Sequence, residues 1–122
     1  MISQFVRTSA LVLICAAGAP ATAGARTVYD GNWSVLIVTE RGSCDRAYRY
    51  GVEIENGRVI YRGGGPDFNG RVSPNGSVQV RVSAGSQSAS GSGRLSRTVG
   101  RGTWRGQAPS GACSGYWEAE KR

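Results

Sequence analysis

Apolar and polar residues alternate along most of the chain with a period of two. In the clearest example Tyr48, Tyr50, Val52 and Ile54 alternate with charged or small residues, and residues 77–83 repeat the pattern with three valines. Successive side chains of a β-strand point to opposite faces, whereas a helix repeats its apolar face about every 3.6 residues. The pattern therefore predicts half-buried strands and no helix.

Short turn signals separate these strands. Asn56-Gly57 and Asn75-Gly76 supply the positive φ angles that tight hairpins require. The segment 83–98 has the serine and glycine content of a linker, but small residues alternate there with polar ones. We interpret it as a weak strand, and as the place where a sheet would open most easily. The pattern predicts eight strands, over residues 33–40, 47–55, 58–62, 68–73, 77–83, 88–96, 100–106 and 112–120.

The first 25 residues have the features of a secretory signal peptide. Arg7 supplies a positive charge, and residues 10–19 form an apolar run too short to span a bilayer. Two A-x-A patterns predict cleavage after Ala23 or after Ala25. We therefore expect residues 26–122 to form one periplasmic or secreted domain, which we expect to be a monomer.

The two cysteines that remain help to choose the architecture. Cleavage removes Cys15 and leaves Cys44 and Cys113, which in an oxidising compartment predict a single disulfide. Eight short hairpin-connected strands can form an up-and-down barrel or a two-sheet sandwich. In a closed barrel the end of the first strand meets the start of the last, where these cysteines lie. We therefore predict a small all-β, antiparallel barrel closed by one disulfide, with a β-sandwich as the alternative.

Glycines occupy several inward positions of the late strands, across from the large aromatic residues of the early ones. Small barrels use such large and small side chains together to fill a tapered interior. Because the predicted strands are only five to nine residues long, we expect side chains to fill the lumen, with a shallow cavity as the alternative. The inward glycines are Gly91, Gly93, Gly102 and Gly115.

The motif Gly31-Asn32-Trp33 lies at the start of the first predicted strand, and Gly-x-Trp recurs at Gly102-Thr103-Trp104 and Gly115-Tyr116-Trp117. At the first strand this motif resembles the opening motif of the calycins, the lipocalin and avidin-like barrels. The resemblance implies a barrel with a tryptophan plugging one end, and the binding of small molecules or, in some branches, of proteases. The chain also resembles small exported bacterial proteins.

Aromatic residues of the late strands form a candidate ligand site. Trp104 and Trp117 lie on neighbouring predicted strands, and core packing is the ordinary role of such inward aromatic residues. Their second interpretation is a stacking platform, with Tyr50, for a small and partly aromatic ligand.

Composition removes most catalytic chemistry. The chain has no histidine, and its one lysine, Lys121, stands next to the C-terminus, so a serine or cysteine triad has no base. The carboxylate pairs Glu53/Glu55 and Glu118/Glu120 each share one outward strand face, which is typical of a solvated surface. We therefore predict no catalytic residue, no metal site and no cofactor, and we expect a binding protein rather than an enzyme.

Positive charge is concentrated in the middle strands. Residues 56–106 carry eight arginines and one carboxylate, Asp67. Guanidinium groups make bidentate contacts to carboxylates and phosphates. With Arg94 placed across a hairpin from about Thr103, the alternation predicts one basic patch on the outer surface. The arginines assigned to this surface are Arg81, Arg94, Arg97, Arg101 and Arg105.

The favoured function is an exported binding protein whose basic surface engages an anionic polymer or an acidic protein surface. Nucleic acid is disfavoured as a partner, because outward aromatic residues between the arginines are missing. One alternative is a calycin-like carrier of a small ligand. Another is a compact barrel protease inhibitor that presents Arg26–Asn32 or Gly63–Asp67 to a protease.

Overall fold

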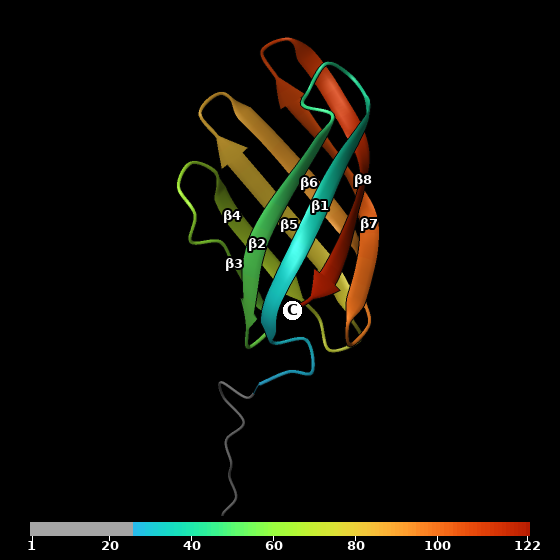
Figure 1. The fold of residues 1–122 in the computed structure, drawn as a ribbon. Coiled ribbons are helices and arrows are strands. Elements are labelled where there is room, and N and C mark those ends of the chain that lie inside the picture. The colour runs from blue at the N-terminus through green and yellow to red at the C-terminus, as the bar shows by residue number, and fades with distance from the viewer. Residues whose placement is uncertain (1–25) are drawn as a thin grey trace, which may run out of the picture.

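The computed structural model describes residues 26–122 as a closed barrel of eight antiparallel strands (Figure 1). Each strand pairs with the next one, and β8 pairs back with β1. The predicted all-β barrel is confirmed and the sandwich alternative is wrong; the predicted signal peptide lies outside the described residues. The strands are β1 (Gly31–Arg41), β2 (Ala47–Glu55), β3 (Arg58–Ile60), β4 (Asp67–Val72), β5 (Ser77–Ala84), β6 (Gln87–Leu95), β7 (Val99–Ala108) and β8 (Gly111–Lys121).

The predicted strands lie close to the observed ones, with two informative differences. Strand β3 ends at Ile60 rather than at residue 62, and it pairs with β4 through only Arg58 and Val59. Strand β6, the expected weak point, pairs along its length with both β5 and β7. Its serines and glycines make it look like a linker, but backbone pairing on both edges supplies the hydrogen bonds that hold a strand. The barrel therefore does not open at this strand.

One end of the barrel is filled by a compact apolar core. Trp33 is its most deeply buried side chain, at 2% exposure, and its indole N–H donates a hydrogen bond to the Tyr29 carbonyl over 2.8 Å. We call this the closed end, as opposed to the mouth, where β1 ends. The other core residues are Tyr29, Val52, Ile54, Val72, Val78, Leu95, Trp117 and Ala119.

The segment that precedes β1 is fastened beneath the closed end. The buried Asp30 carboxylate accepts hydrogen bonds from the Thr27 hydroxyl over 2.6 Å and from the backbone N–H groups of Asn56 and Gly57 over 2.8 and 3.3 Å. Lys121 donates to the Val28 carbonyl over 3.0 Å. These contacts tie residues 27–30 to the β2–β3 turn and to the end of β8.

Two tryptophan rings lie against bare backbone on the inner wall. The Trp117 ring covers Gly93 and Gly102, where an added Cβ would come within 2.5 and 2.7 Å of indole carbons. Trp104 pairs with Gly115, so that no side chain separates its ring from the backbone of β8. The inward glycines therefore make room for Trp104 and Trp117, rather than balancing the aromatic residues of the early strands as expected.

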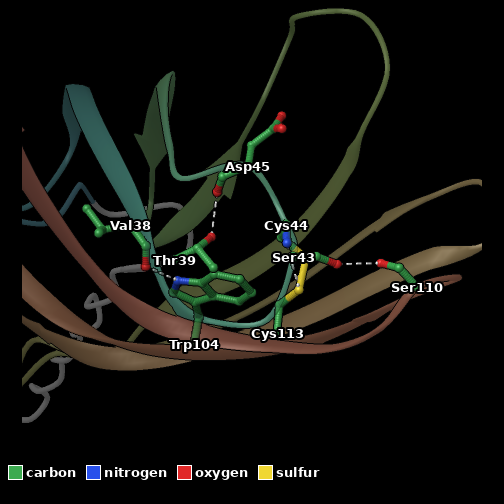
Figure 2. Close-up of a disulfide and its surroundings, with 8 residues drawn as sticks. All are labelled: Val38, Thr39, Ser43, Cys44, Asp45, Trp104, Ser110 and Cys113. Atoms are coloured by element: carbon green, nitrogen blue, oxygen red, sulfur yellow. Dashed lines mark hydrogen bonds between the residues drawn. A yellow bond between two sulfur atoms is a disulfide. The ribbon is translucent and has the colours of Figure 1, made fainter.

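The predicted disulfide joins Cys44 and Cys113 at the mouth (Figure 2). The Cα atoms of the two residues are 6.1 Å apart, and the Cys44 N–H donates to Cys113 Sγ over 3.2 Å. The hydroxyls of Ser43 and Ser110 lie within hydrogen-bond distance beside the bridge, at 2.9 Å. The bridge fastens the β1–β2 loop to β8 across a sequence separation of 69 residues. In the chain-entropy view a loop of this length contributes about 4 kcal/mol.

The glycines beneath Trp117 generate a stability prediction. In Gly102→Ala the new Cβ would clash with the Ser92 carbonyl and the Trp117 ring, so we expect the free energy of unfolding to fall by about 1–3 kcal/mol. Gly51→Ala is the matched control, because a Cβ there meets no atom within 4 Å. Urea unfolding measures both variants. Equal stability of the two variants would contradict the role given to Gly102.

Asp30 generates a prediction about pH. Burial alone would raise the pKa of Asp30, but the hydrogen bonds from Thr27, Asn56 and Gly57 outweigh it and lower the pKa below its ordinary value of 3.8. A lowered pKa in the folded state stabilises the fold above the ordinary value, and this contribution is lost as the pH falls through the lowered value.

Asp30→Asn should therefore reduce the free energy of unfolding at pH 7 by about 1–3 kcal/mol. The loss of stability on acidification should also become shallower in this variant. Chemical denaturation at pH values from 7 down to 2 measures both effects. Asp67→Asn, a change at an exposed carboxylate, serves as the control. A variant at Asp30 with the stability and acid response of the unchanged protein would show that this carboxylate does not hold the segment.

Candidate functional site

The barrel is hollow from its mouth down to the core of the closed end, so that core residues such as Trp33, Ile54 and Leu95 also line the hollow from below. It contains a cavity of about 470 Å³ that is lined by side chains from the strands and by Cys44, Asp45 and Pro66 of the mouth loops. Figure 1 shows hairpin loops gathered at this end and the segment before β1 at the other. The expectation of a filled lumen is correct for the closed end and wrong for the mouth half.

Small side chains create this space. Strands β5, β6 and β7 carry alanine or glycine at several positions that line the cavity near the mouth, whereas the closed end carries Trp33, Leu95 and Trp117. An eight-stranded barrel is just wide enough for large side chains to fill or for one small ligand to enter. Side-chain size at each height therefore decides which half stays open. The small residues at the mouth are Ala84, Ala89, Gly91, Gly106 and Ala108.

A cluster of aromatic rings forms one side of the mouth half. The Tyr50 ring stacks on Tyr48 at a centroid distance of 5.3 Å and meets Phe68 edge to face, also at 5.3 Å. Phe68 in turn lies 4.7 Å from Tyr61. Tyr48 is 52% exposed and lines the cavity together with Tyr50 and Phe68. Such a cluster offers ring faces and edges to a flat apolar ligand.

The hydroxyl of Tyr50 stays protonated at neutral pH. Burial raises the pKa of Tyr50 above its ordinary value of 10.0, and the neighbouring Tyr48, Tyr61 and Asp45 raise it further. A neutral phenol can both donate and accept a hydrogen bond. Tyr50 can therefore contribute a polar contact to a ligand as well as ring surface.

Trp104 lines the cavity from β7 (Figure 2). Its indole N–H donates to the Val38 carbonyl over 3.0 Å, and beside it the Thr39 hydroxyl donates to the Asp45 carbonyl over 2.5 Å. Because the backbone satisfies the indole N–H, the ring itself is left for apolar contact. Asp45, Gln87 and Gln107 supply polar groups among the lining residues.

The structure brings the three predicted ligand residues to one cavity, but at different depths. Tyr50 and Trp104 are half-buried, whereas Trp117 is buried in the core and donates its indole N–H to the Ser92 carbonyl over 3.2 Å. Trp117 therefore forms part of the floor of the cavity. Sequence reasoning missed the contributions of Tyr48 and Phe68 to the site, although Tyr48 belongs to the alternating segment that also contains Tyr50.

The predicted arginine patch is divided into two rows by the observed register. Arg94 lies opposite Arg101, and Thr103 lies opposite Ser92, so the expected pairing of Arg94 with Thr103 is wrong. Arg105 lies four residues further along β7, in a different row, and Arg97 is exposed in the β6–β7 turn. Arg41, which sequence reasoning did not consider, lies opposite Ser114.

The row that contains Arg105 crosses six neighbouring strands. Cα partners in the strand pairing connect its members directly from β4 through β8 to β1. The same residues line an open groove of about 740 Å³ on the outer surface. We call this set the arginine row, and its members in order are Asn69, Arg81, Ser90, Arg105, Ser114 and Arg41.

The described part of the chain contains no helix with the length and hydropathy needed to cross a membrane. Within residues 26–122 no three Cys, Asp or Glu side chains gather in a way that could hold a metal ion.

Comparison of the chain with protein-family models, curated proteins and solved structures finds no match. The resemblance of Gly31-Asn32-Trp33 to the calycin motif therefore stays a prediction.

Proposed function

We propose that this protein is an exported carrier that binds a small, partly aromatic molecule in the mouth half of its barrel. The observation that supports this proposal best is the cavity of about 470 Å³. Its volume lies within the range of known small-molecule sites, which is roughly 300–1,000 Å³. Its wall is mainly apolar, as the walls of such sites usually are. Export follows from the predicted signal peptide.

The lining residues suggest the chemistry of the ligand. Tyr50 and Phe68 on one side and Trp104 on another offer ring surface to a flat apolar body. Asp45 and Gln87 offer hydrogen-bonding groups to a polar end of the ligand. We therefore expect a molecule with an apolar ring system that enters the barrel first and a polar group that stays near the mouth.

The outer arginines are a separate candidate. Sequence analysis favoured them over the lumen, but the lumen has a mainly apolar wall inside the barrel, whereas the arginines line a more polar groove on its outer surface. Contact with apolar walls removes ligand surface from water, which is the main source of affinity for small apolar molecules. The lumen is therefore the better supported site for a small ligand. The protease-inhibitor alternative stays a prediction, and in its first segment Tyr29 and Asp30 are buried.

Filling the cavity should abolish ligand binding. N-phenyl-1-naphthylamine, an uncharged fluorescent probe with two aromatic groups, should bind the protein, gain fluorescence and quench tryptophan emission. Ala89→Phe places a large ring in the lumen, where Ala89 lies between Val82 and Gly106, and should weaken binding by about tenfold or more. Ser92→Phe on the same strand is the matched control, because Ser92 is exposed on the outer face.

Two further measurements make the test decisive. Thermal unfolding verifies that the variants fold, and Trp104→Phe should retain probe binding while losing part of the tryptophan quenching. If the Ala89→Phe variant is folded and binds the probe as tightly as the unchanged protein, the proposed site is refuted.

A further inference from the structure

We propose that the arginine row binds an anionic polysaccharide that carries about one acidic group per disaccharide. This site lies on the outer face of the barrel and goes beyond the carrier function, which uses the inner face. Successive residues of a strand point to opposite faces, so an outer site can be occupied independently of the lumen.

The arginines of the row are regularly spaced. Arg81, Arg105 and Arg41 occur on every second strand, with Ser90 and Ser114 as their Cα partners on the strands between. Neighbouring strands are about 4.8 Å apart, so the backbones of successive arginines are about 10 Å apart. An extended polysaccharide with an acidic group on every second sugar presents its charges at a similar interval.

The guanidinium groups of the arginine row are not neutralised by neighbouring carboxylates within residues 26–122. Within residues 26–122 the only ion pairs join Arg62 to Glu53 and Glu55, so the three guanidinium groups of the row have no carboxylate partner. The one acidic side chain that lines the groove is Asp67, which lies outside the row. Arginine forks make short, charge-assisted hydrogen bonds to carboxylates, sulfates and phosphates.

The second row of arginines also forms no ion pair within residues 26–122, but it has different neighbours. Arg94 donates a hydrogen bond to the Asn75 carbonyl over 3.1 Å, and Arg101 lies opposite Glu118 of β8 as well as opposite Arg94. These residues are not among those that line the outer groove. They therefore provide a control with the same charge but without the groove.

The residues beside the arginines in the groove are suited to binding sugar hydroxyls. Six of the residues that line the groove beside the arginines carry hydroxyl or amide side chains, which can exchange hydrogen bonds with sugar hydroxyls. None of the groove residues is aromatic, whereas sites for single-stranded nucleic acid use aromatic rings to stack the bases. An extended acidic peptide presents side chains on one face about every 6.8 Å, which does not match the row. The hydroxyl and amide residues are Asn69, Ser83, Ser88, Ser90, Gln107 and Ser114.

The experiment uses a hyaluronan decasaccharide, which carries one carboxylate per disaccharide, and protein recovered from expression of the full chain. Calorimetry at low ionic strength should detect binding that weakens steeply as salt is added. The double variant Arg81→Ser/Arg105→Ser should bind about tenfold more weakly or worse. The control Arg94→Ser/Arg101→Ser loses the same charge and should change the affinity by less than about threefold.

The comparison ligands are a neutral dextran and an oligothymidylate with the same number of charges. We expect dextran not to bind and oligothymidylate to bind more weakly than hyaluronan. Equal losses of hyaluronan affinity in the two double variants would show that only the net charge of the protein matters, and would overturn the proposal. Tighter binding of oligothymidylate, or no hyaluronan binding at all, would also overturn it.

Failure of this proposal can be told apart from failure of the carrier function. Binding of N-phenyl-1-naphthylamine should be the same in both arginine variants, because their side chains point away from the lumen. A protein that binds the probe but not hyaluronan retains the carrier function alone.

Discussion

Backbone pairing between β1 and β8 joins the two ends of the folded domain and converts a row of eight strands into a barrel. Without it both strands would expose an unpaired edge, which is a site for aggregation. The pairing extends from Trp33 with Lys121 to Arg41 with Ser114, and it is reinforced at both ends. The Cys44–Cys113 disulfide lies at the mouth, and the hydrogen bond from Lys121 to Val28 lies at the closed end. Closure also creates the lumen on which the proposed carrier function depends.

The distribution of side-chain size then divides that space. At the closed end Trp33 and Trp117 lie among aliphatic side chains, and Gly93 and Gly102 let the Trp117 ring lie flat on the wall. Near the mouth, small residues on β5 to β7 leave the lumen open, and the aromatic cluster and Trp104 line what remains. A single barrel thus combines a packed half that stabilises the fold with an open half that can hold a ligand.

The period of two was enough to predict the eight strands, because it depends only on which face of each strand is buried. The disulfide was predicted from the two cysteines that remain after cleavage of the signal peptide, and their places at the end of the first strand and the start of the last then favoured the closed barrel. The cavity could not be predicted in this way, because it depends on which small residues share one height in the barrel. Ala89, Gly106 and Val82 are neighbours only once the register of β5, β6 and β7 is known.

The arginine surface shows the same limit more sharply. The predicted pairing of Arg94 with Thr103 and the observed pairing with Arg101 differ by a slip of two residues. Such a slip keeps every side chain on its predicted face, so alternation cannot detect it. The slip nevertheless moves each residue to another row. It is set by the tight β6–β7 turn, where the Ser96 N–H donates to the Val99 carbonyl over 2.7 Å. The outward arginines were therefore identified correctly, while their grouping needed the structure.

The central claim is that one half of the lumen is packed and the other half can hold a ligand. The three indole N–H groups report on this directly, because Trp33 lies at the closed end, Trp117 in the floor and Trp104 beside the mouth. We would record their ¹⁵N–¹H nuclear magnetic resonance signals while adding N-phenyl-1-naphthylamine to saturation. The account predicts a large shift of the Trp104 signal, a smaller one for Trp117 and the smallest for Trp33, whose indole N–H is bonded to the Tyr29 carbonyl at the closed end. Three unchanged indole signals at saturation would contradict it.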